Sequence, residues 1–358
     1  MREVVLRPGR ERSVRRRHPW LLSGSVDREP GESAAGELVR VRSAEGETLG
    51  YGDYSSRSQL RVRLVAFGKD EPPADWLRLR LAASLARRES DPRLRGTDAL
   101  RLANAEGDGL PGLVVDRYAD VAVVRASTAA MAARRGEAAR FLLEAGARAV
   151  VARDDGAAAR REGFVPAEGA LAGEPPSGPV EIQEHGRVYG VDVLRGQKTG
   201  FYLDQRDSRG LVESLAEGRR VLDLFCYTGG FGAAAARGGA SALTLVDASE
   251  AALEGVYDLV IVDPPPLARR SADVDRAARA YKDVFLHALR AAAPGAFVLL
   301  FRCSHHVSPE LLRKIAFGAS LDAGRPVQVA GTLGAPSDHP VSLDHPEGDY
   351  LSGLLLRA

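Results

Sequence analysis

The fold is decided by residues 220–232, which read Arg-Val-Leu-Asp-Leu-Phe-Cys-Tyr-Thr-Gly-Gly-Phe-Gly. A short apolar run passes into a glycine-rich turn and then into an alanine-rich segment, a pattern that predicts a strand, a tight turn and a helix start. In a doubly wound α/β sheet, such a turn lets the backbone approach a ligand at the carboxyl end of the first strand. We therefore expect a C-terminal Rossmann-like domain with a ligand site at this turn.

The next two strand-like runs carry acidic residues to the same edge of the expected sheet. Residues 242–246 precede Asp247, at a spacing of about 20 residues from the glycines, where an acid can bind ribose hydroxyls. Residues 257–262 precede Asp263-Pro264-Pro265, whose prolines lack N–H donors and fix the loop, so the carboxylate is aimed into the cleft. The turn lacks the G-x-G-x-x-G spacing, and no P-loop lysine is present. We expect a nucleoside cofactor, and the Asp-Pro-Pro run resembles the substrate-side motif of methyltransferases that act on bases.

A further buried run, residues 296–301, leads into Arg302-Cys303-Ser304-His305-His306. A cysteine at the cleft edge of a strand is placed to be a nucleophile. Most free cysteines are small core residues, which is the interpretation we favour for Cys226, but the position of Cys303 favours catalysis. A zinc site built from Cys303, His305, His306 and His339 matches no common ligand spacing, so we expect no metal.

Three runs carry a resemblance to a known family. They are residues 196–206, which read Gly-Gln-Lys-Thr-Gly-Phe-Tyr-Leu-Asp-Gln-Arg, residues 223–231, and Cys303-Ser304-His305-His306. These runs resemble the bacterial 23S ribosomal RNA cytosine-C5 methyltransferases, a family with a PUA domain at its amino end, and the similarity covers essentially the whole chain. The resemblance implies S-adenosylmethionine as cofactor, 23S ribosomal RNA as partner and the formation of 5-methylcytidine.

The strand ends and the resemblance together give the expected cofactor-binding residues. Lys198 and Arg206 supply cations suited to the methionine carboxylate or a phosphate; the alternative is a helix start with solvated charges. The full expected set is Lys198, Arg206, Asp223, Phe225, Tyr227, Thr228, Gly229, Phe231, Asp247, Asp263 and Pro264.

The expected reaction follows from the chemistry of cytosine, whose C5 is a poor nucleophile until a thiolate adds at C6. Cys303 is the expected thiolate, and Asp263, protonated or sharing a proton, is expected to hydrogen-bond the region of N3 and the exocyclic amine. C5 then takes the methyl group, and loss of the C5 proton with elimination frees Cys303. His305 and a water molecule are both open as the base, and the nucleotide must first be unstacked.

The composition of the chain bears on the expected location of the protein and on where RNA can bind. The chain has 358 residues, 45% of them apolar, and no apolar run near the ~18 residues of a membrane span. An arginine-rich amino end without an apolar signal segment and only two cysteines, both expected to be free thiols, favour a soluble cytoplasmic monomer or homodimer. Because the net charge is only +1, an RNA surface must be local. We expect Arg15, Arg16 and Arg17, together with Lys198, to bind phosphates, although arginine is also simply the favoured base of this chain.

The predicted domains are a PUA-like β module over residues 1–70, a central α+β domain over residues 74–178 and the methyltransferase domain over residues 180–358. Within the central domain, the pattern predicts one helix over residues 128–145 and a linker or loop over residues 168–179. A hairpin is predicted around His185-Gly186. Trp20 is interpreted as a core residue in preference to an RNA-stacking platform.

Only nine residues separate Asp247 from Tyr257. A doubly wound domain needs a helix, a strand and a second helix there, and a parallel crossover alone takes about a dozen residues or more. Two explanations stay open. Either a stretch has been omitted, which we favour because a helix starting at residues 248–254 would lack packing partners, or the protein lacks the segment that closes the adenine pocket.

Two other functions remain open. The first is methylation of an amino group on an RNA purine, whose usual motif places an aromatic residue where this chain has Pro266. The second is a non-catalytic RNA-binding protein of the same fold that has lost its affinity for the cofactor.

Overall fold

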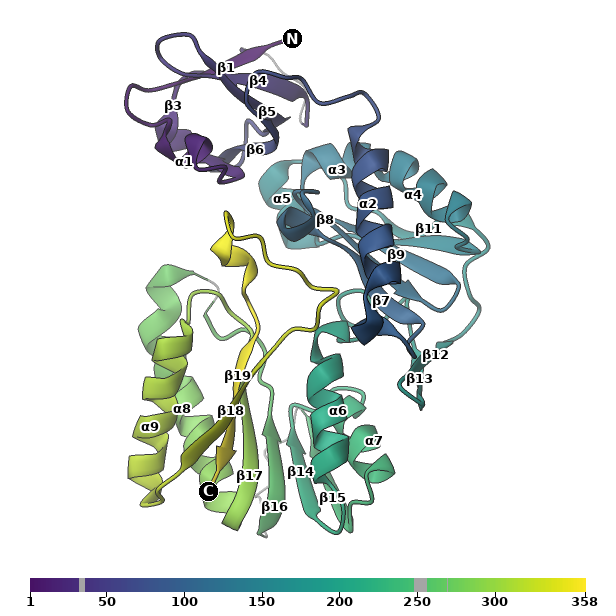
Figure 1. Cartoon of the computed structure of the whole chain (residues 1–358), viewed down its shortest axis with the longest axis vertical. Helices are drawn as coiled ribbons and strands as arrows, with labels where there is room; N and C mark the ends of the chain where they lie inside the picture. The colour runs from purple at the N-terminus through teal and green to yellow at the C-terminus, as the bar shows by residue number, and fades with distance from the viewer. Residues whose placement is uncertain (32–35, 248–255, 269) are drawn as a thin grey trace. The chain divides into compact units, whose positions relative to one another are not determined.

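The computed structural model describes residues 1–31, 36–247, 256–268 and 270–358. The chain forms two compact units (Figure 1). Unit 1 comprises Met1–Leu203 and Ser337–Gly348, and unit 2 comprises Asp204–Pro336 and Asp349–Ala358. The three-domain division expected from the sequence stays a prediction.

Unit 1 begins with a six-stranded sheet in the order β2-β6-β5-β4-β1-β3. Its elements are β1 (Glu3–Leu6), α1 (Arg12–Arg15), β2 (Trp20–Leu22), β3 (Val26–Arg28), β4 (Leu38–Arg42), β5 (Thr48–Tyr54) and β6 (Leu60–Phe67). Val39 and Val41 of β4 are buried while the alternating arginines face outward, as the period-two pattern requires. Gly52 of β5 lets β6 pair closely, because an added Cβ would lie 2.4 Å from the carbonyl oxygen of Arg63. The predicted β module is confirmed.

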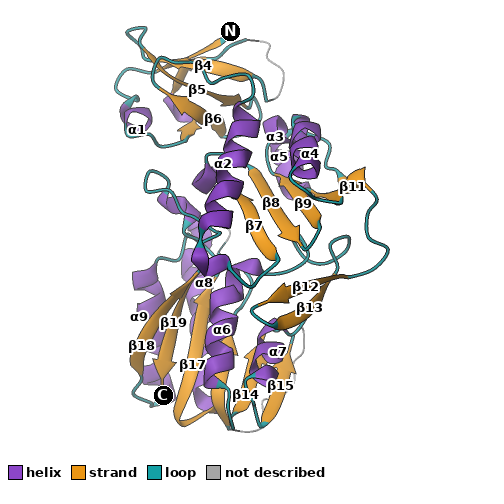
Figure 2. Ribbon diagram, turned by 45° about the vertical axis from the view of Figure 1, so that its right-hand side comes forward, coloured by secondary structure: helices purple, strands orange, loops and turns teal. Residues whose placement is uncertain are grey.

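The second sheet of unit 1 has the order β11-β10-β9-β8-β7. Its elements are α2 (Trp76–Ser90), β7 (Ala99–Asn104), β8 (Leu113–Tyr118), β9 (Val121–Ala126), α3 (Ala129–Ala133), α4 (Arg135–Glu144), β10 (Ala149–Arg153), α5 (Gly156–Glu162) and β11 (Glu168–Gly173). Helices α2 and α4 pack on one face of this sheet, and Figure 2 shows α2 lying along β7. The other face packs against the hairpin of β12 (Val180–Glu184) and β13 (Arg187–Val191).

Two predictions in this region were wrong. The single helix over residues 128–145 is divided into α3 and α4 at Arg134, whose ψ of 6° leaves the helical range and whose guanidinium lies 3.0 Å from Asp53. The predicted linker begins with a strand, β11, which pairs with β10 in antiparallel register. This glycine-containing run has few apolar side chains, of which Leu171 and Ala172 pack against the core of unit 1, so it gave only a weak strand signal. The predicted hairpin is confirmed, with φ of 49° at His185 and 82° at Gly186.

The segment Ser337–Gly348 belongs to unit 1, although the residues on either side of it belong to unit 2. The fully buried Asp338 holds it in place: its carboxylate accepts from the backbone N–H of Arg101 at 2.9 Å, and its carbonyl accepts from Arg88 at 2.8 Å. The amide of Asn104 adds a bond to the carbonyl of Pro340 at 3.0 Å.

Unit 2 is a doubly wound domain whose sheet has the order β15-β14-β16-β17-β19-β18. Its elements are α6 (Arg206–Leu215), β14 (Arg220–Leu224), α7 (Gly230–Arg237), β15 (Ala242–Val246), β16 (Tyr257–Val262), α8 (Val274–Ala291), β17 (Ala292–Arg302), α9 (Pro309–Ala323), β18 (Gln328–Gly334) and β19 (Ser352–Arg357). Strands β15, β14, β16 and β17 are parallel, and β19 and β18 are antiparallel additions. Figure 1 shows α8 and α9 on one face and α6 and α7 on the other, so the predicted Rossmann-like fold is confirmed.

The order of the strands creates a switch point at β14, which pairs with β15 on one side and β16 on the other. Ligands of open α/β sheets bind outside the carboxyl ends of the strands at such a point. In the described part of the chain, β15 pairs only with β14, and Leu243 and Leu245 are 39% and 47% exposed. The helix expected over residues 248–254 lies outside the described residues.

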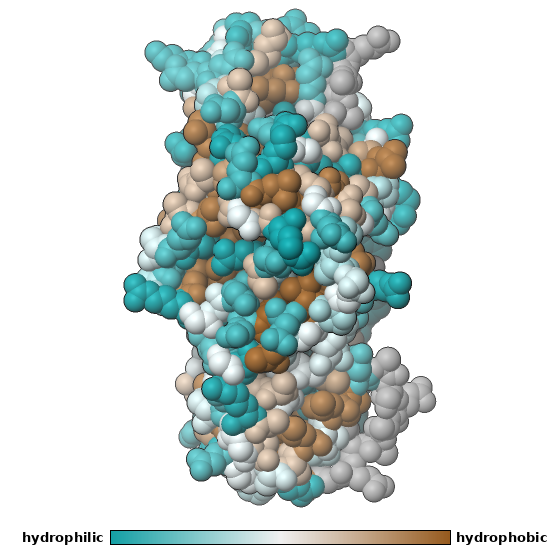
Figure 3. Space-filling model, turned by 90° about the vertical axis from the view of Figure 1, so that its right-hand side faces the viewer, coloured by the Kyte–Doolittle hydropathy of each residue, from teal (hydrophilic) through white to brown (hydrophobic). Residues whose placement is uncertain are grey.

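In the described ranges, no helix combines the length and the apolar character that crossing a bilayer would require. On the face drawn in Figure 3, hydrophilic side chains cover most of the surface and apolar ones are dispersed among them.

Candidate active site

Cys303 and Asp263 meet at the carboxyl edge of the unit 2 sheet. Each directly follows its strand, β17 or β16, and because these strands are parallel neighbours their ends lie side by side. The thiol of Cys303 donates to Oδ1 of Asp263 at 3.3 Å, and both residues are half-buried. The structure therefore brings together the two side chains that the sequence proposed for catalysis and leaves them accessible.

Two further contacts fix this pair. The Nε2 amide of Gln205, a residue that is 2% exposed, donates to Oδ2 of Asp263 at 2.9 Å. The hydroxyl of Ser304 donates to the carbonyl of Ala268 at 2.6 Å and so ties the loop after β17 to the loop after β16. Gln205 lies within the run of residues 196–206 but was not among the expected site residues. Only its neighbours there, Lys198 and Arg206, carried a charge that pointed to a ligand.

Two tyrosines lie near the pair, one buried and one half-buried. Tyr281 of α8 is completely inaccessible, and burial, with a smaller contribution from charge on Cys303, raises its pKa to about 12. It is therefore a neutral phenol at physiological pH. Tyr350 donates from its hydroxyl to Oδ2 of Asp204 at 2.7 Å, which links the approach to β19 with the start of α6.

The cofactor turn has an unusual backbone. Phe225 and Tyr227 adopt φ of 63° and 48°, in the left-handed region that L residues rarely occupy. The N–H of Phe225 donates to the carbonyl of Val246 at 2.8 Å, so the turn folds onto the end of β15. A Cβ at Gly232 would lie 2.6 Å from the end of the Leu245 side chain, which would have to move to admit a larger residue. The strain is localised at the ligand edge, where it is commonly stored.

Asp223 is the least satisfied group of this edge. It is fully buried, and neither of its carboxylate oxygens has a hydrogen-bond partner of normal geometry within the described residues. Burial, reinforced by the charges of Asp263 and Asp247 and opposed by the N–H of Gly232, raises its pKa to about 7. A buried carboxylate beside two other acids suits a cationic ligand. S-adenosylmethionine carries an ammonium and a sulfonium group, so these residues fit that cofactor.

The other residues expected to bind the cofactor differ in how exposed they are and in where they lie. Asp247 is exposed at the end of β15, and Thr228 is exposed on the turn. Phe231 is buried and stacks on Phe301 with ring centroids 6.0 Å apart, so it packs in the core. Arg206 is fully buried at the start of α6. Lys198 belongs to unit 1, where its ammonium lies 4.3 Å from the ring centroid of Tyr202.

The three arginines expected to bind RNA have different surroundings in unit 1. Arg15 pairs with Glu47, and Arg17 lies 3.9 Å from Asp344 with its guanidinium over the ring of Phe67. Arg16 is exposed and lines a cavity of about 900 Å³. Arg10 and Arg12, which the sequence reasoning missed, line the same cavity. The four-residue spacing of Arg12 and Arg16 was the available signal, because residues four apart share a helix face.

The cavity combines cationic, aromatic and apolar lining. Its lining residues are Gly9, Arg10, Arg12, Ser13, Arg16, His18, Trp20, Leu22, Ser25, Leu343, Asp344 and Glu347. Trp20 is half-buried, donates from Nε1 to Glu106 at 2.8 Å and lies edge-on to His345 at 4.4 Å. Leu22 and Leu343 are 54% and 102% exposed, so the cavity offers apolar surface beside its arginines.

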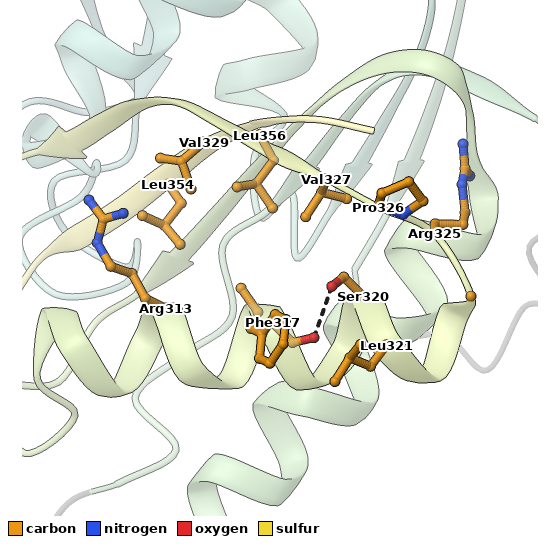
Figure 4. A pocket seen from close by; sticks show the side chains of 12 residues that line it. Arg313, Phe317, Ser320, Leu321, Arg325, Pro326, Val327, Val329, Leu354 and Leu356 are labelled. Carbon is orange, nitrogen blue, oxygen red and sulfur yellow. Dashed lines mark hydrogen bonds between the residues drawn. The ribbon is translucent and has the colours of Figure 1, made fainter.

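A separate groove of about 460 Å³ lies in unit 2 between α9 and the strands β18 and β19 (Figure 4). Phe317 and Leu321 face it from the helix, and Val329, Leu354 and Leu356 face it from the strands. None of the candidate site residues lines this groove, so it is distinct from the Cys303 site.

Two family models match the chain. Residues 4–67 match a PUA-like domain, and residues 157–254 match an S-adenosylmethionine-dependent methyltransferase. The chain is similar to the ribosomal RNA large subunit methyltransferase I of Shewanella frigidimarina, with 38% identity over 391 residues covering 99% of this chain and 98% of that protein. It is also similar to the protein of the same name from Aeromonas hydrophila, with 37% identity over 394 residues covering 99% of each.

Solved structures of the same fold include a methyltransferase complexed with SAH, which has a TM-score of 0.85 and 20% identity and covers 100% of both chains. A second is described as a SAM-dependent methyltransferase from Streptococcus mutans, with a TM-score of 0.83 and 20% identity over 100% of both chains. The alignment with the Shewanella protein spans 391 positions against 358 residues here, so at least 33 positions, the difference between the two, are gaps in this chain.

Proposed function

Because the chain belongs to the ribosomal RNA large subunit methyltransferase I family, we propose that it methylates C5 of a cytosine in 23S ribosomal RNA, with S-adenosylmethionine as methyl donor. The observation that carries this proposal is the contact of 3.3 Å between the Cys303 thiol and Asp263, at the strand edge that also bears the cofactor turn. A thiol that donates to a carboxylate is poised to lose its proton and attack an electron-poor carbon.

The proposed reaction uses the two side chains in sequence. The Cys303 proton passes to Oδ1 of Asp263 as Sγ forms a bond to C6 of the cytosine. The π electrons of the C5–C6 bond move toward C4 and N3, and Asp263 returns the proton to N3. S-adenosylmethionine, when bound, supplies the methyl group that C5 takes. A base then removes the C5 proton, the electron pair restores the C5–C6 double bond as Cys303 leaves as the thiolate, and the N3 proton returns through Asp263 to Cys303.

RNA binding is proposed for the cavity of unit 1. Arg10, Arg12 and Arg16 are exposed, and no carboxylate within the described residues pairs with them, so their charges are available to phosphates. Exposed Leu22 and Leu343 in the same cavity offer apolar contact to an unstacked base. Arg15 and Arg17, whose guanidinium groups already lie beside carboxylates, and Lys198 stay part of the wider proposed surface.

The test is mass spectrometry of 23S ribosomal RNA incubated with the purified protein and S-adenosylmethionine. We expect 5-methylcytidine with the wild type and with Ser320→Ala, a control whose hydroxyl bonds only within α9 at 2.9 Å. Cys303→Ala should give none. RNA containing 5-fluorocytidine should form a covalent complex that survives denaturing gels, since fluorine blocks the loss of a C5 proton. Methylated purine, or full activity of Cys303→Ala, would support the amino-group methyltransferase instead.

A second candidate function is a non-catalytic RNA-binding protein. The exposed leucines of β15 favour it, because they lie on the strand whose end carries Asp247, where the ribose would be held. Calorimetry with S-adenosylhomocysteine separates the two candidates. A measurable heat of binding supports the enzyme, and its absence, with RNA binding retained, supports the binding protein.

A further inference from the structure

Arg302 is a buried cation that forms no ion pair with a carboxylate in the part of the chain that the structure describes. It precedes Cys303 at the end of β17 and is 1% exposed. Its Nη1 donates to the carbonyl of Ser304 at 2.6 Å and to the carbonyls of Asp349 and Tyr350 at 3.2 Å each, and its Nη2 donates to the hydroxyl of Ser352 at 2.7 Å. All four acceptors are neutral. Burying a charge without a counter-ion is costly, so such a residue calls for an explanation.

The guanidinium of Arg302 holds the backbone next to Cys303 in place through hydrogen bonds. Arg302 lies on one side of Cys303 in the chain, and the carbonyl that it binds, that of Ser304, lies on the other. The remaining bonds reach the residues that enter β19, so the loop that carries Cys303 is attached to the neighbouring strand. Together with the bond from Ser304 to Ala268, this restricts the thiol to the position beside Asp263.

The charge of Arg302 also acts on the thiol. Burial lowers the pKa of Arg302, whereas Asp349 and a Cys303 thiolate favour its charged form. The attraction is mutual, because an opposite charge favours the ionised state of both partners. The Asp263 carboxylate, which accepts from Sγ, acts against a thiolate, whereas the buried Tyr281 stays a neutral phenol below about pH 12. Glu310 interacts with Arg302 more weakly than Asp349 does.

We propose that Arg302 is a positioning residue for Cys303, whose fixed positive charge offsets the negative charge that Cys303 and Asp263 carry together once the thiol has lost its proton. The inference rests on the proposed role of Cys303 as nucleophile. In other reactive-cysteine sites, a histidine or lysine beside the thiol favours the thiolate. The proposal gives this function to the buried guanidinium. Arg302 touches neither the cytosine nor the cofactor in this assignment.

The experiment measures the rate of alkylation of Cys303 by iodoacetamide from pH 6 to 10, with peptide mapping to follow Cys303 and Cys226 separately. The thiolate is the reactive form, so the midpoint of the pH profile reports the acidity of each thiol. Replacing the cation with Arg302→Met should move the Cys303 midpoint upward by about one unit or more, whereas Arg302→Lys should move it by less. The Cys226 profile should stay the same in all variants.

The matched control is Arg325→Met. Like Arg302, Arg325 donates to backbone carbonyls, those of Leu289 and Ala292, but at the opposite end of β17. We expect this variant to leave the Cys303 midpoint unchanged. Equal midpoints in the wild type and Arg302→Met would overturn the proposal, as would an equal shift in Arg302→Lys and Arg302→Met. If Arg302→Met does not fold, Arg302→Gln removes the charge while keeping two donors and is judged by the same criteria.

Turnover adds a second readout. Arg302→Lys keeps the charge but lacks the two guanidinium nitrogens that together bond Ser304 and the residues at the start of β19. We therefore expect kcat to fall at least about tenfold while the midpoint of the alkylation profile stays low. Alkylation needs neither RNA nor cofactor. A failure of the methylation assay with an intact effect of Arg302 on Cys303 would therefore count against the proposed reaction and leave this inference standing.

Discussion

Gln205 and Asp263 are joined by a hydrogen bond of 2.9 Å from Nε2 to Oδ2, which leaves Oδ1 to accept from the thiol of Cys303 at 3.3 Å. Each carboxylate oxygen therefore has a distinct donor, and the plane of the carboxyl group is fixed between an amide and a sulfur. Holding a catalytic carboxyl group in one orientation contributes to the reaction rate in addition to the acidity of the group.

Replacing Gln205 with Leu should lower kcat by about 10- to 100-fold with little change in the KM for RNA, because the carboxylate loses its orientation while the RNA surface stays intact. Methylation kinetics on a 23S ribosomal RNA fragment provide the measurement. Gln197→Leu is the control, since the carbonyl oxygen of Gln197 accepts from Tyr202 within unit 1 at 2.7 Å. A rise in KM alone would place Gln205 in RNA binding.

Cofactor binding should depend on pH through Asp223. Its carboxylate has a pKa of about 7 without ligand, and only the ionised form attracts the ammonium of S-adenosylhomocysteine. Affinity should therefore be highest above pH 7 and fall as the pH drops through that value, by about tenfold per unit at the acidic end. Isothermal calorimetry from pH 5.5 to 8.5 measures this, and Asp223→Asn should bind weakly with a nearly flat profile. A flat profile in the wild type would show that Asp223 is not the group that binds the ammonium.

The same carboxyl group should influence the stability of the ligand-free protein. Its folded pKa of about 7 lies above the unfolded value of 3.8, so the folded state holds the proton more tightly. This contribution is complete below about pH 4 and is lost as the pH rises to about 7. Urea unfolding of Asp223→Asn and wild type should show the variant gaining about 2 kcal/mol relative to wild type between pH 5 and pH 8. A constant difference over this range would contradict the assignment.

The cavity of unit 1 should account for much of the salt-sensitive binding of RNA. Changing Arg10, Arg12 and Arg16 together to Ala should weaken binding of a single-stranded oligonucleotide at least about tenfold and reduce the slope of log K against log salt by about 2. Fluorescence anisotropy across a salt series gives both numbers. Arg140, Arg160 and Arg161, also exposed arginines of unit 1, form a control triple with the same change in charge. Equal losses in both triples would mean that net charge, and not this cavity, governs binding.

The exposed edge of β15 predicts weak binding of the adenosine part of the cofactor. Replacing residues 248–256 with a designed segment long enough to form a helix and a strand should cover Leu243 and Leu245 and tighten S-adenosylhomocysteine binding by about tenfold, or ~1.4 kcal/mol. A glycine-serine insert of the same length is the control. No gain over that insert would show that the residues present already suffice for the cofactor.

The four parallel strands of unit 2 could be predicted from sequence because each contains a short, largely apolar run, whereas β18 and β19 were not predicted. The bounds expected for residues 242–246 and 257–262 are those of β15 and β16. A buried parallel strand needs nothing more than such a run. The acidic residue or cysteine that follows each run then falls at the ligand edge by topology alone, which is why Asp263 and Cys303 could be paired before their distance was known.

The proposed roles of Gln205 and Arg302 could not be predicted from the residues next to them in sequence. Gln205 is neutral, and Arg302 resembles any of the many arginines in this chain until its burial is known. The arginine run at residues 15–17 stands out along the chain, but its density does not show which guanidinium groups already lie beside a carboxylate. Partners distant in sequence decide these roles.

The path of the chain through Ser337–Gly348 bears on how the protein can be divided. The backbone passes from one unit to the other three times, after Leu203, Pro336 and Gly348, so neither unit is a single continuous stretch. A fragment that stops at Leu203 loses the acceptors on Asp338 and Pro340 and leaves Arg88 and Asn104 without them. Expression of the amino-terminal half alone should therefore give a poorly soluble product that a synthetic peptide covering residues 337–348 rescues.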